Sequence, residues 1–167
     1  MIHDIDIILS FIKSEVKQID ANGVAVVSDH IDIANARIQF ENGAVANVTA
    51  SRISQKKMRK MRIFQKDHYL SLDFVTGASE VYRLQPVDQP ALPAAISFGE
   101  IGVGDKKKRL IYEQPESKEV NALNYELQLF IDSVLYDKKI IVSGEDGLRA
   151  LKVAEIIIQK IEQSKGA

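Results

Sequence analysis

Apolar residues recur with a helical period at the start of the chain. Four aliphatic side chains follow one another at intervals of three or one residues: Ile5, Ile8, Leu9 and Ile12. That spacing places them on one face of an amphipathic α-helix. Only Met1, Ile2 and His3 are available ahead of this helix to cap its free N–H groups, whereas a first helix normally has a longer lead-in. We therefore expect the chain to be a fragment of a longer protein.

A strand pattern follows the first helix. From Glu15 to about Leu84, short runs rich in Val, Ile, Phe and Tyr alternate with turn-forming dipeptides, which is typical of a strand meander. Asn42-Gly43 lies between strands predicted over residues 32–40 and 44–51, and these two residue types tolerate the positive φ angles of a tight hairpin. Both strands are rich in Ala, Asn and Thr, so we expect a second sheet or a partner subunit to pack closely there.

The second half of the chain changes from an irregular segment to helices. Residues 86–116 hold all four prolines and three of the nine glycines, so we expect little regular structure beyond one or two short edge strands. Ser117 is predicted to open a helix whose apolar stripe covers the sheet. After a short strand over residues 140–142, Ser143 and Asp146 have the spacing of a capping box and predict the start of the closing helix.

The order of these elements predicts the fold class. Strands come first and helices later, with hairpins in place of alternating strand–helix–strand units, which is typical of an α+β fold. We predict that residues 1–167 form a single α+β domain with a largely antiparallel open sheet. Its helices pack on one face, and the other face is available for dimerisation.

Composition excludes several classes of function. The 167 residues carry 22 basic and 23 acidic side chains, a net charge of −1, so no bulk charge draws the chain to nucleic acid or to an anionic membrane. The absence of cysteine excludes disulfide scaffolds, thiolate metal sites and cysteine nucleophiles, and it fits a reducing compartment. The longest strongly apolar run, residues 7–12, is far shorter than a membrane-spanning helix needs. We expect a cytoplasmic protein without nucleic-acid or membrane partners.

One histidine and two carboxylates lie together in the predicted first helix: His3, Asp4 and Asp6. In one interpretation the aspartates favour the positive end of the helix, and His3 caps the helix or protrudes. In the other, the imidazole exchanges a proton with a substrate hydroxyl. A metal site is less favoured, because no second histidine lies at ligand spacing from His3.

The densest basic stretch runs from Arg52 to Arg62. It is interpreted either as a solvated edge strand, in which lysines discourage aggregation, or as a phosphate or carboxylate site that uses Arg52 or Lys57. Nucleic-acid binding is the weakest alternative, because no stacking aromatic motif accompanies the charge. The sequence also lacks a Gly-rich phosphate fingerprint and the G-x-S-x-G and H-E-x-x-H motifs. We therefore expect no complete catalytic apparatus in this chain.

Five segments together resemble the C-terminal domain of the Gfo/Idh/MocA family, which includes glucose–fructose oxidoreductase and inositol dehydrogenase. In order along the chain they are residues 2–7 (IHDIDI), 36–46 (ARIQFENGAVA), 49–54 (TASRIS), 130–132 (FID) and 142–151 (VSGEDGLRAL). The resemblance implies the substrate-binding and oligomerisation domain of an NAD(P)-dependent oxidoreductase that acts on a sugar, cyclitol or related hydroxyl compound. Such a protein is expected to form a homodimer or a higher homo-oligomer.

The same resemblance implies roles for individual residues. An N-terminal Rossmann domain, absent from this chain, would bind NAD or NADP, so the chain is expected to bind no cofactor and to be inactive alone. The family's proton-transferring histidine lies four residues after an aspartate, and it matches His3, while the aspartate would precede residue 1. Arg52 and Lys57 lie in a region that can approach the substrate in the resembling proteins.

An alternative from another functional class stays open at this point. The chain would then be a stand-alone dimeric module that holds an anionic ligand on its basic strand and has no redox role. The two hypotheses differ on His3, which only the oxidoreductase requires.

Overall fold

The chain forms two compact units. The computed structural model describes residues 1–90, 95–116 and 121–164. The first unit comprises Met1–Gln55 with Leu123–Ala167, and the second comprises Lys56–Ala122. Helices occur in the first unit and both units contain antiparallel open sheets, so the predicted α+β fold class is confirmed.

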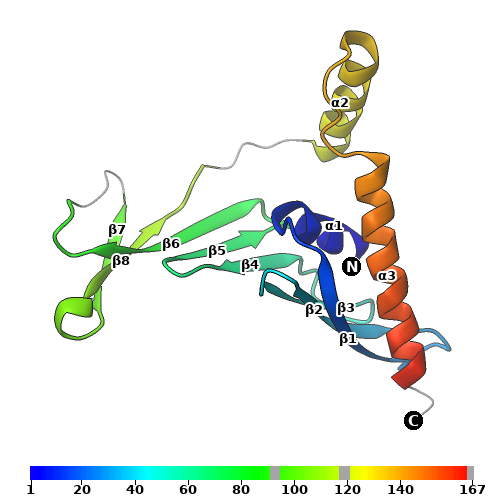
Figure 1. Cartoon of the computed structure of the whole chain (residues 1–167), viewed down its shortest axis with the longest axis horizontal. Coiled ribbons are helices and arrows are strands. Elements are labelled where there is room, and N and C mark those ends of the chain that lie inside the picture. The colour runs from blue at the N-terminus through cyan, green and yellow to red at the C-terminus, as the bar shows by residue number, and fades with distance from the viewer. Residues whose placement is uncertain (91–94, 117–120, 165–167) are drawn as a thin grey trace. The chain divides into compact units, whose positions relative to one another are not determined.

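The first unit contains a three-stranded sheet and the helices (Figure 1). Its elements are α1 (Ile2–Phe11), β1 (Val16–Val24), β2 (Ile33–Phe40), β3 (Val45–Ser51), α2 (Ala122–Tyr136) and α3 (Gly144–Ser164). The strands lie in the order β1-β2-β3, and both pairings are antiparallel. The predicted hairpin at Asn42-Gly43 is confirmed: Gly43 has φ +84°, and the Ala44 N–H donates to Asn42 Oδ1 at 3.0 Å.

Alternation along the strands builds the core of the first unit. Eleven buried hydrophobic residues form one cluster: Ile5, Leu9, Ile19, Ala36, Ile38, Phe40, Val48, Ala150, Val153, Ile157 and Ile161. They come from α1, from α3 and from one face of the sheet, which we call the inner face. At Gly23 an added Cβ would lie 2.9 Å from Ile31 Cγ2 and 3.0 Å from Ile161 Cγ2, so the absent side chain permits the close approach of α3 to β1. Helices therefore cover the inner face of this sheet, as predicted.

The start of α3 agrees with the prediction, whereas the strand predicted just before it is not formed. The predicted capping box of α3 is confirmed, because the Asp146 N–H donates to Ser143 Oγ at 3.2 Å and the Ser143 N–H donates to Asp146 Oδ2 at 2.9 Å. The strand predicted over residues 140–142 is wrong. Residues Ile140, Ile141 and Val142 are exposed and lie outside the strands formed by the described residues.

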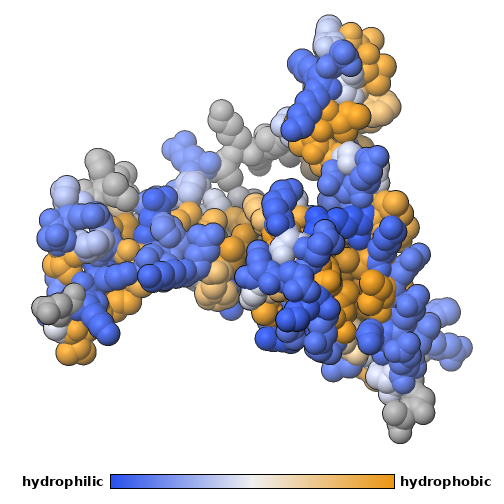
Figure 2. Space-filling model, viewed as in Figure 1, coloured by the Kyte–Doolittle hydropathy of each residue, from blue (hydrophilic) through white to orange (hydrophobic). Residues whose placement is uncertain are grey.

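The prediction that α2 covers the sheet is also wrong for the residues that the structure describes. None of the residues of α2 is buried, and Phe130 is 66% exposed. Figure 2 shows hydrophobic side chains of α2 at the surface. The apolar stripe is present in the sequence. A helical period predicts that a helix has an apolar face, but it does not predict which part of the protein packs against that face. The predicted start at Ser117 lies outside the described residues.

The second unit is a five-stranded antiparallel sheet in the order β4-β5-β6-β8-β7. Its strands are β4 (Lys60–Phe64), β5 (His68–Asp73), β6 (Ala78–Pro86), β7 (Ile96–Ile101) and β8 (Lys108–Glu113), with a short 3₁₀ helix, η1 (Gly104–Lys106), before β8. The segment predicted as mostly irregular thus supplies β7 and β8. Of these, β7 is an edge strand as expected, whereas β8 lies inside the sheet.

Candidate functional site

His3 lies at the start of α1. It is the second residue of the helix and is exposed, and the N-cap residue, Met1, makes no side-chain capping bond. Asp4 lies in the first turn of the helix, where the positive helix end favours a carboxylate, and its Oδ2 lies 3.4 Å from the Met1 amino group. The exposed imidazole is accessible to a ligand at this helix end.

Arg52 has a well-defined partner in the carboxylate of Asp32. Asp32 precedes β2 and is 3% exposed, and its Oδ1 accepts a hydrogen bond from Arg52 Nε at 2.6 Å. Its Oδ2 accepts hydrogen bonds from the backbone N–H groups of Val26 and Val27 at 2.7 and 2.8 Å. Those two N–H groups, followed by Arg52 and Ser28, hold the pKa of Asp32 far below its ordinary value of 3.8. Asp32 is therefore an ionised anchor that joins the turn after β1 to the end of β3.

The two predicted basic site residues belong to different units of the chain. Arg52 belongs to the first unit and Lys57 to the second. Lys57 is exposed in the segment before β4, and β4 is an edge strand, as the solvated-edge interpretation expects. Although Asp32 holds its guanidinium, the Arg52 side chain is 51% exposed.

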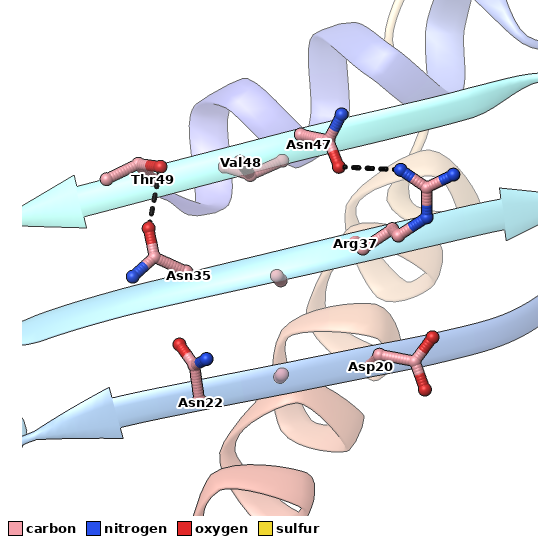
Figure 3. A pocket seen from close by; sticks show the side chains of 9 residues that line it. Asp20, Asn22, Asn35, Arg37, Asn47, Val48 and Thr49 are labelled. Atoms are coloured by element: carbon pink, nitrogen blue, oxygen red, sulfur yellow. Dashed lines mark hydrogen bonds between the residues drawn. The ribbon is translucent and has the colours of Figure 1, made fainter.

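The sheet face opposite the helices carries a polar hollow of about 410 Å³ (Figure 3). Six polar side chains line it, two from each strand: Asp20, Asn22, Asn35, Arg37, Asn47 and Thr49. They lie in two cross-strand rows, because Arg37 is the register partner of both Asp20 and Asn47, and Asn35 has the same relation to Asn22 and Thr49. We call this face the outer face.

Two side-chain hydrogen bonds on the outer face join β2 to β3, and within β1 Gln18 Nε2 donates to the Asp20 carboxylate. Arg37 Nη1 donates to Asn47 Oδ1 at 3.3 Å, and Thr49 Oγ1 donates to Asn35 Oδ1 at 2.8 Å. Figure 3 shows both bonds, with the Asp20 carboxylate on the neighbouring strand β1. The hollow thus presents a carboxylate, a guanidinium and carboxamides, which can bind hydroxyl-bearing or polar protein groups.

The sheet separates His3 from the polar hollow. Ile5 and Leu9 pack α1 against the inner face, whereas the hollow lies on the outer face. Sequence interpretation singled out neither Asp32 nor the six polar side chains. The alternation of polar and apolar residues along β1, β2 and β3 could have identified the outer face, but no local pattern specifies that Arg52 meets Asp32, 20 residues earlier in the chain.

The residues that the structure describes contain neither a candidate metal site nor a candidate membrane-spanning helix. Across residues 1–90, 95–116 and 121–164, no group of three or more His, Asp or Glu side chains is placed to hold a metal ion. Within the same ranges no helix is sufficiently long and apolar to cross a membrane.

Comparison with known proteins relates this chain both to a family model and to a curated dehydrogenase. The model of the GFO/IDH/MocA C-terminal domain matches residues 1–70. The UDP-N-acetylglucosamine 3-dehydrogenase of Acidithiobacillus ferrooxidans is 32% identical over 154 residues, which is 92% of this chain and 44% of that protein. This chain therefore spans somewhat less than half the length of that curated relative.

Solved structures show the same fold. A structure of UDP-N-acetylglucosamine 3-dehydrogenase GnnA from Acidithiobacillus ferrooxidans has a TM-score of 0.81 and 29% identity, covering 98% of this chain and 47% of that one. The WlbA dehydrogenase from Bordetella pertussis, solved in complex with NADH and UDP-GlcNAcA, has a TM-score of 0.62 and 12% identity, covering 98% of this chain and 41% of that one. At this lower identity the likeness shows the fold alone.

Proposed function

Because the chain belongs to the GFO/IDH/MocA family of oxidoreductases, we propose that it is the substrate-binding and dimerisation domain of an NAD(P)-dependent enzyme. The substrate class is a sugar, cyclitol or related hydroxyl compound. One observation carries this proposal: 92% of the chain aligns at 32% identity with UDP-N-acetylglucosamine 3-dehydrogenase. A cytoplasmic location is part of the proposal, supported by the cysteine-free sequence.

The nucleotide is assigned to a part of the protein outside this chain. In the segment that the structure describes, the only Gly-x-Gly sequence is Gly102-Val103-Gly104, which leads into η1 and then β8. A dinucleotide cradle needs a glycine turn that opens a helix, so that the helix N-terminus faces the pyrophosphate. These residues therefore do not fit NAD or NADP, and we assign the cofactor to a preceding N-terminal Rossmann domain.

His3 is the proposed acid/base of the reaction. Its imidazole is exposed on the first turn of α1, and an imidazole can give or take the proton of a substrate hydroxyl near neutral pH. Arg52 and Lys57 are the proposed substrate contacts. Arg52 is half exposed while Asp32 fixes its position, so part of its guanidinium is accessible to a polar substrate group.

The test is His3→Ala in the full-length protein. Loss of a positioned acid/base lowers turnover by about 10²- to 10⁴-fold, while the thermal unfolding midpoint stays near that of the parent protein because His3 is exposed. Steady-state kinetics with a panel of sugar and cyclitol substrates provide the measurement, and His68→Ala, at another exposed histidine, serves as the control. Unchanged turnover would remove His3 from the mechanism and favour a binding module without redox chemistry.

A further inference from the structure

The guanidinium of Arg52 is held along one of its edges. Its Nε donates to Asp32 Oδ1 at 2.6 Å, and its Nη2 donates to Ser28 Oγ at 2.9 Å. In a planar guanidinium these two nitrogens carry N–H groups on the same side, so this edge faces the turn between β1 and β2. The backbone N–H of Arg52 also donates to the Asp32 carbonyl, at 3.0 Å. Arg52 is therefore fixed at both its backbone and its guanidinium.

The partners of Arg52 are themselves held in place. The Asp32 side chain is 0% exposed, and its Oδ2 accepts hydrogen bonds from the backbone N–H groups of Val26, Val27 and Ser28 at 2.7, 2.8 and 3.2 Å. Ser28 Oγ donates to Asp32 Oδ1 at 3.0 Å and accepts from the His30 N–H at 3.2 Å. The guanidinium cannot rotate without losing its bonds to two fixed oxygens, so the turn determines its orientation.

A second edge of the same guanidinium remains open. Arginine has five N–H donors, and Asp32 and Ser28 accept from two of them. The adjoining edge is formed by Nη1 and the second N–H of Nη2, and we call it the Arg52 fork. In the part of the chain that the structure describes, Nη1 has no acceptor, and the side chain is 51% exposed. The Arg52 fork is therefore a pair of donors that is oriented before any ligand arrives.

The direction of the ion pair favours a ligand with negative charge. The Asp32 carboxylate is buried and shared with three backbone N–H groups, whereas the guanidinium reaches the surface, so an approaching ligand meets the cation first. Two parallel N–H donors match the paired oxygens of a carboxylate or a phosphate, and such bidentate, charge-assisted bonds are the strong ones. A hydroxyl group offers a single oxygen and cannot match both donors.

We propose that the Arg52 fork binds an oxyanion of the substrate, namely a phosphate or a carboxylate group. This inference rests on the proposed function, in which Arg52 is a substrate contact. It narrows the substrate class to hydroxyl compounds that also carry such a group. Arg52, Asp32 and Ser28 all belong to the first unit, so the site can be tested in this chain.

Titration with inorganic phosphate and with acetate, at pH 7 and constant ionic strength, tests the inference. The Nε–Hε signal of Arg52 and the backbone amide signal of Ser28, followed by ¹H–¹⁵N NMR, should shift and saturate. The anion with the lower dissociation constant identifies the group that the fork prefers. Arg52→Lys keeps the charge but removes the paired donors, so it should raise that dissociation constant by about tenfold or more.

The matched control removes a positive charge elsewhere in the same unit. Lys17→Gln changes an exposed residue of β1 and should leave the dissociation constant unchanged. Circular dichroism checks that each variant is folded. If Arg52→Lys does not fold, the parent chain still decides, because an anion on the fork must move the Arg52 signal more than the corresponding signal of Arg149, whose Nη2 donates to the Ser14 carbonyl.

The outcomes separate this inference from the proposed function. The absence of a saturable shift with both anions, or equal affinities of the parent chain and folded Arg52→Lys, overturns the oxyanion site. If His3→Ala nevertheless lowers turnover in the full-length protein, the oxidoreductase function still stands. Saturable binding at the fork combined with unchanged turnover of His3→Ala retains the oxyanion site and overturns the proposed function.

Discussion

At the scale of single residues, Asp32 is a buried carboxylate whose two oxygens both accept hydrogen bonds. Three backbone N–H groups, the Ser28 hydroxyl and the guanidinium of Arg52 all donate to its carboxylate. A buried carboxylate is tolerated when its oxygens are satisfied in this way. The positions of the turn after β1 and of Arg52 therefore both depend on the charge of Asp32.

We predict that Asp32 makes the fold sensitive to acid. Its folded-state pKa lies far below the ordinary value of 3.8, so its contribution to stability is present above about pH 4 and is lost as the pH falls through the folded-state pKa. Asp32→Asn should be less stable than the parent chain at neutral pH and should lose less stability between about pH 5 and pH 3. Urea unfolding at several pH values measures both effects.

The control for this prediction lies in the same turn. Asp29→Asn changes an exposed carboxylate and should leave the slope of stability against pH near that of the parent chain. Equal slopes for the parent and Asp32→Asn would contradict the assignment of Asp32 as an ionised anchor.

At the scale of elements, α2 and α3 show what a periodic sequence does and does not specify. Both have an apolar stripe, but α3 buries Ala150, Val153, Ile157 and Ile161 while α2 buries nothing. The capping box and the Asn-Gly hairpin were predictable because their interactions are local. Whether another element packs on α2, and where β8 lies in its sheet, depend on residues far away in the sequence. Local sequence patterns carry no information about those residues.

A matched pair of substitutions measures this difference. Ile157→Ala removes a side chain that is 2% exposed and should lower the free energy of unfolding by about 2 to 5 kcal/mol. Phe130→Ala removes a larger side chain that is 66% exposed and should change it by less than about 0.5 kcal/mol. Chemical denaturation of the two variants gives both values, and equal losses would mean that α2 packs against the fold.

At the scale of the whole molecule, the chain corresponds to less than half of its relatives. It covers 44% of the aligned dehydrogenase, and the site residues suggested by the sequence belong to both units. His3 lies on the helix side of the first sheet, and Lys57 belongs to the other unit. The family resemblance could be predicted from ordered motifs, whereas the polar hollow arises from strand pairing and became evident only in the folded structure.

We predict that the isolated chain does not bind nicotinamide nucleotides. Gly102-Val103-Gly104 leads into η1 and a strand, so it offers no helix N-terminus to a pyrophosphate. Isothermal titration calorimetry with NAD(H) and NADP(H) should show no heat of binding, with the full-length protein as the positive control. Micromolar affinity of the isolated chain would contradict the assignment of the cofactor to a separate domain.

Five aromatic rings lie side by side across the five-stranded sheet, in the order Phe64, Tyr69, Tyr82, Tyr112 and Phe98. This aromatic stripe has an optical consequence. The protein contains five tyrosines and no tryptophan, and three of the tyrosines, Tyr69, Tyr82 and Tyr112, are neighbours in the stripe. Chromophores with centroids 5.2 and 5.1 Å apart exchange excitation energy. The other two, Tyr125 and Tyr136, lie exposed on α2. The ultraviolet emission and near-ultraviolet dichroism of this protein are therefore intrinsic, label-free reporters of two surfaces, the stripe and the uncovered helix.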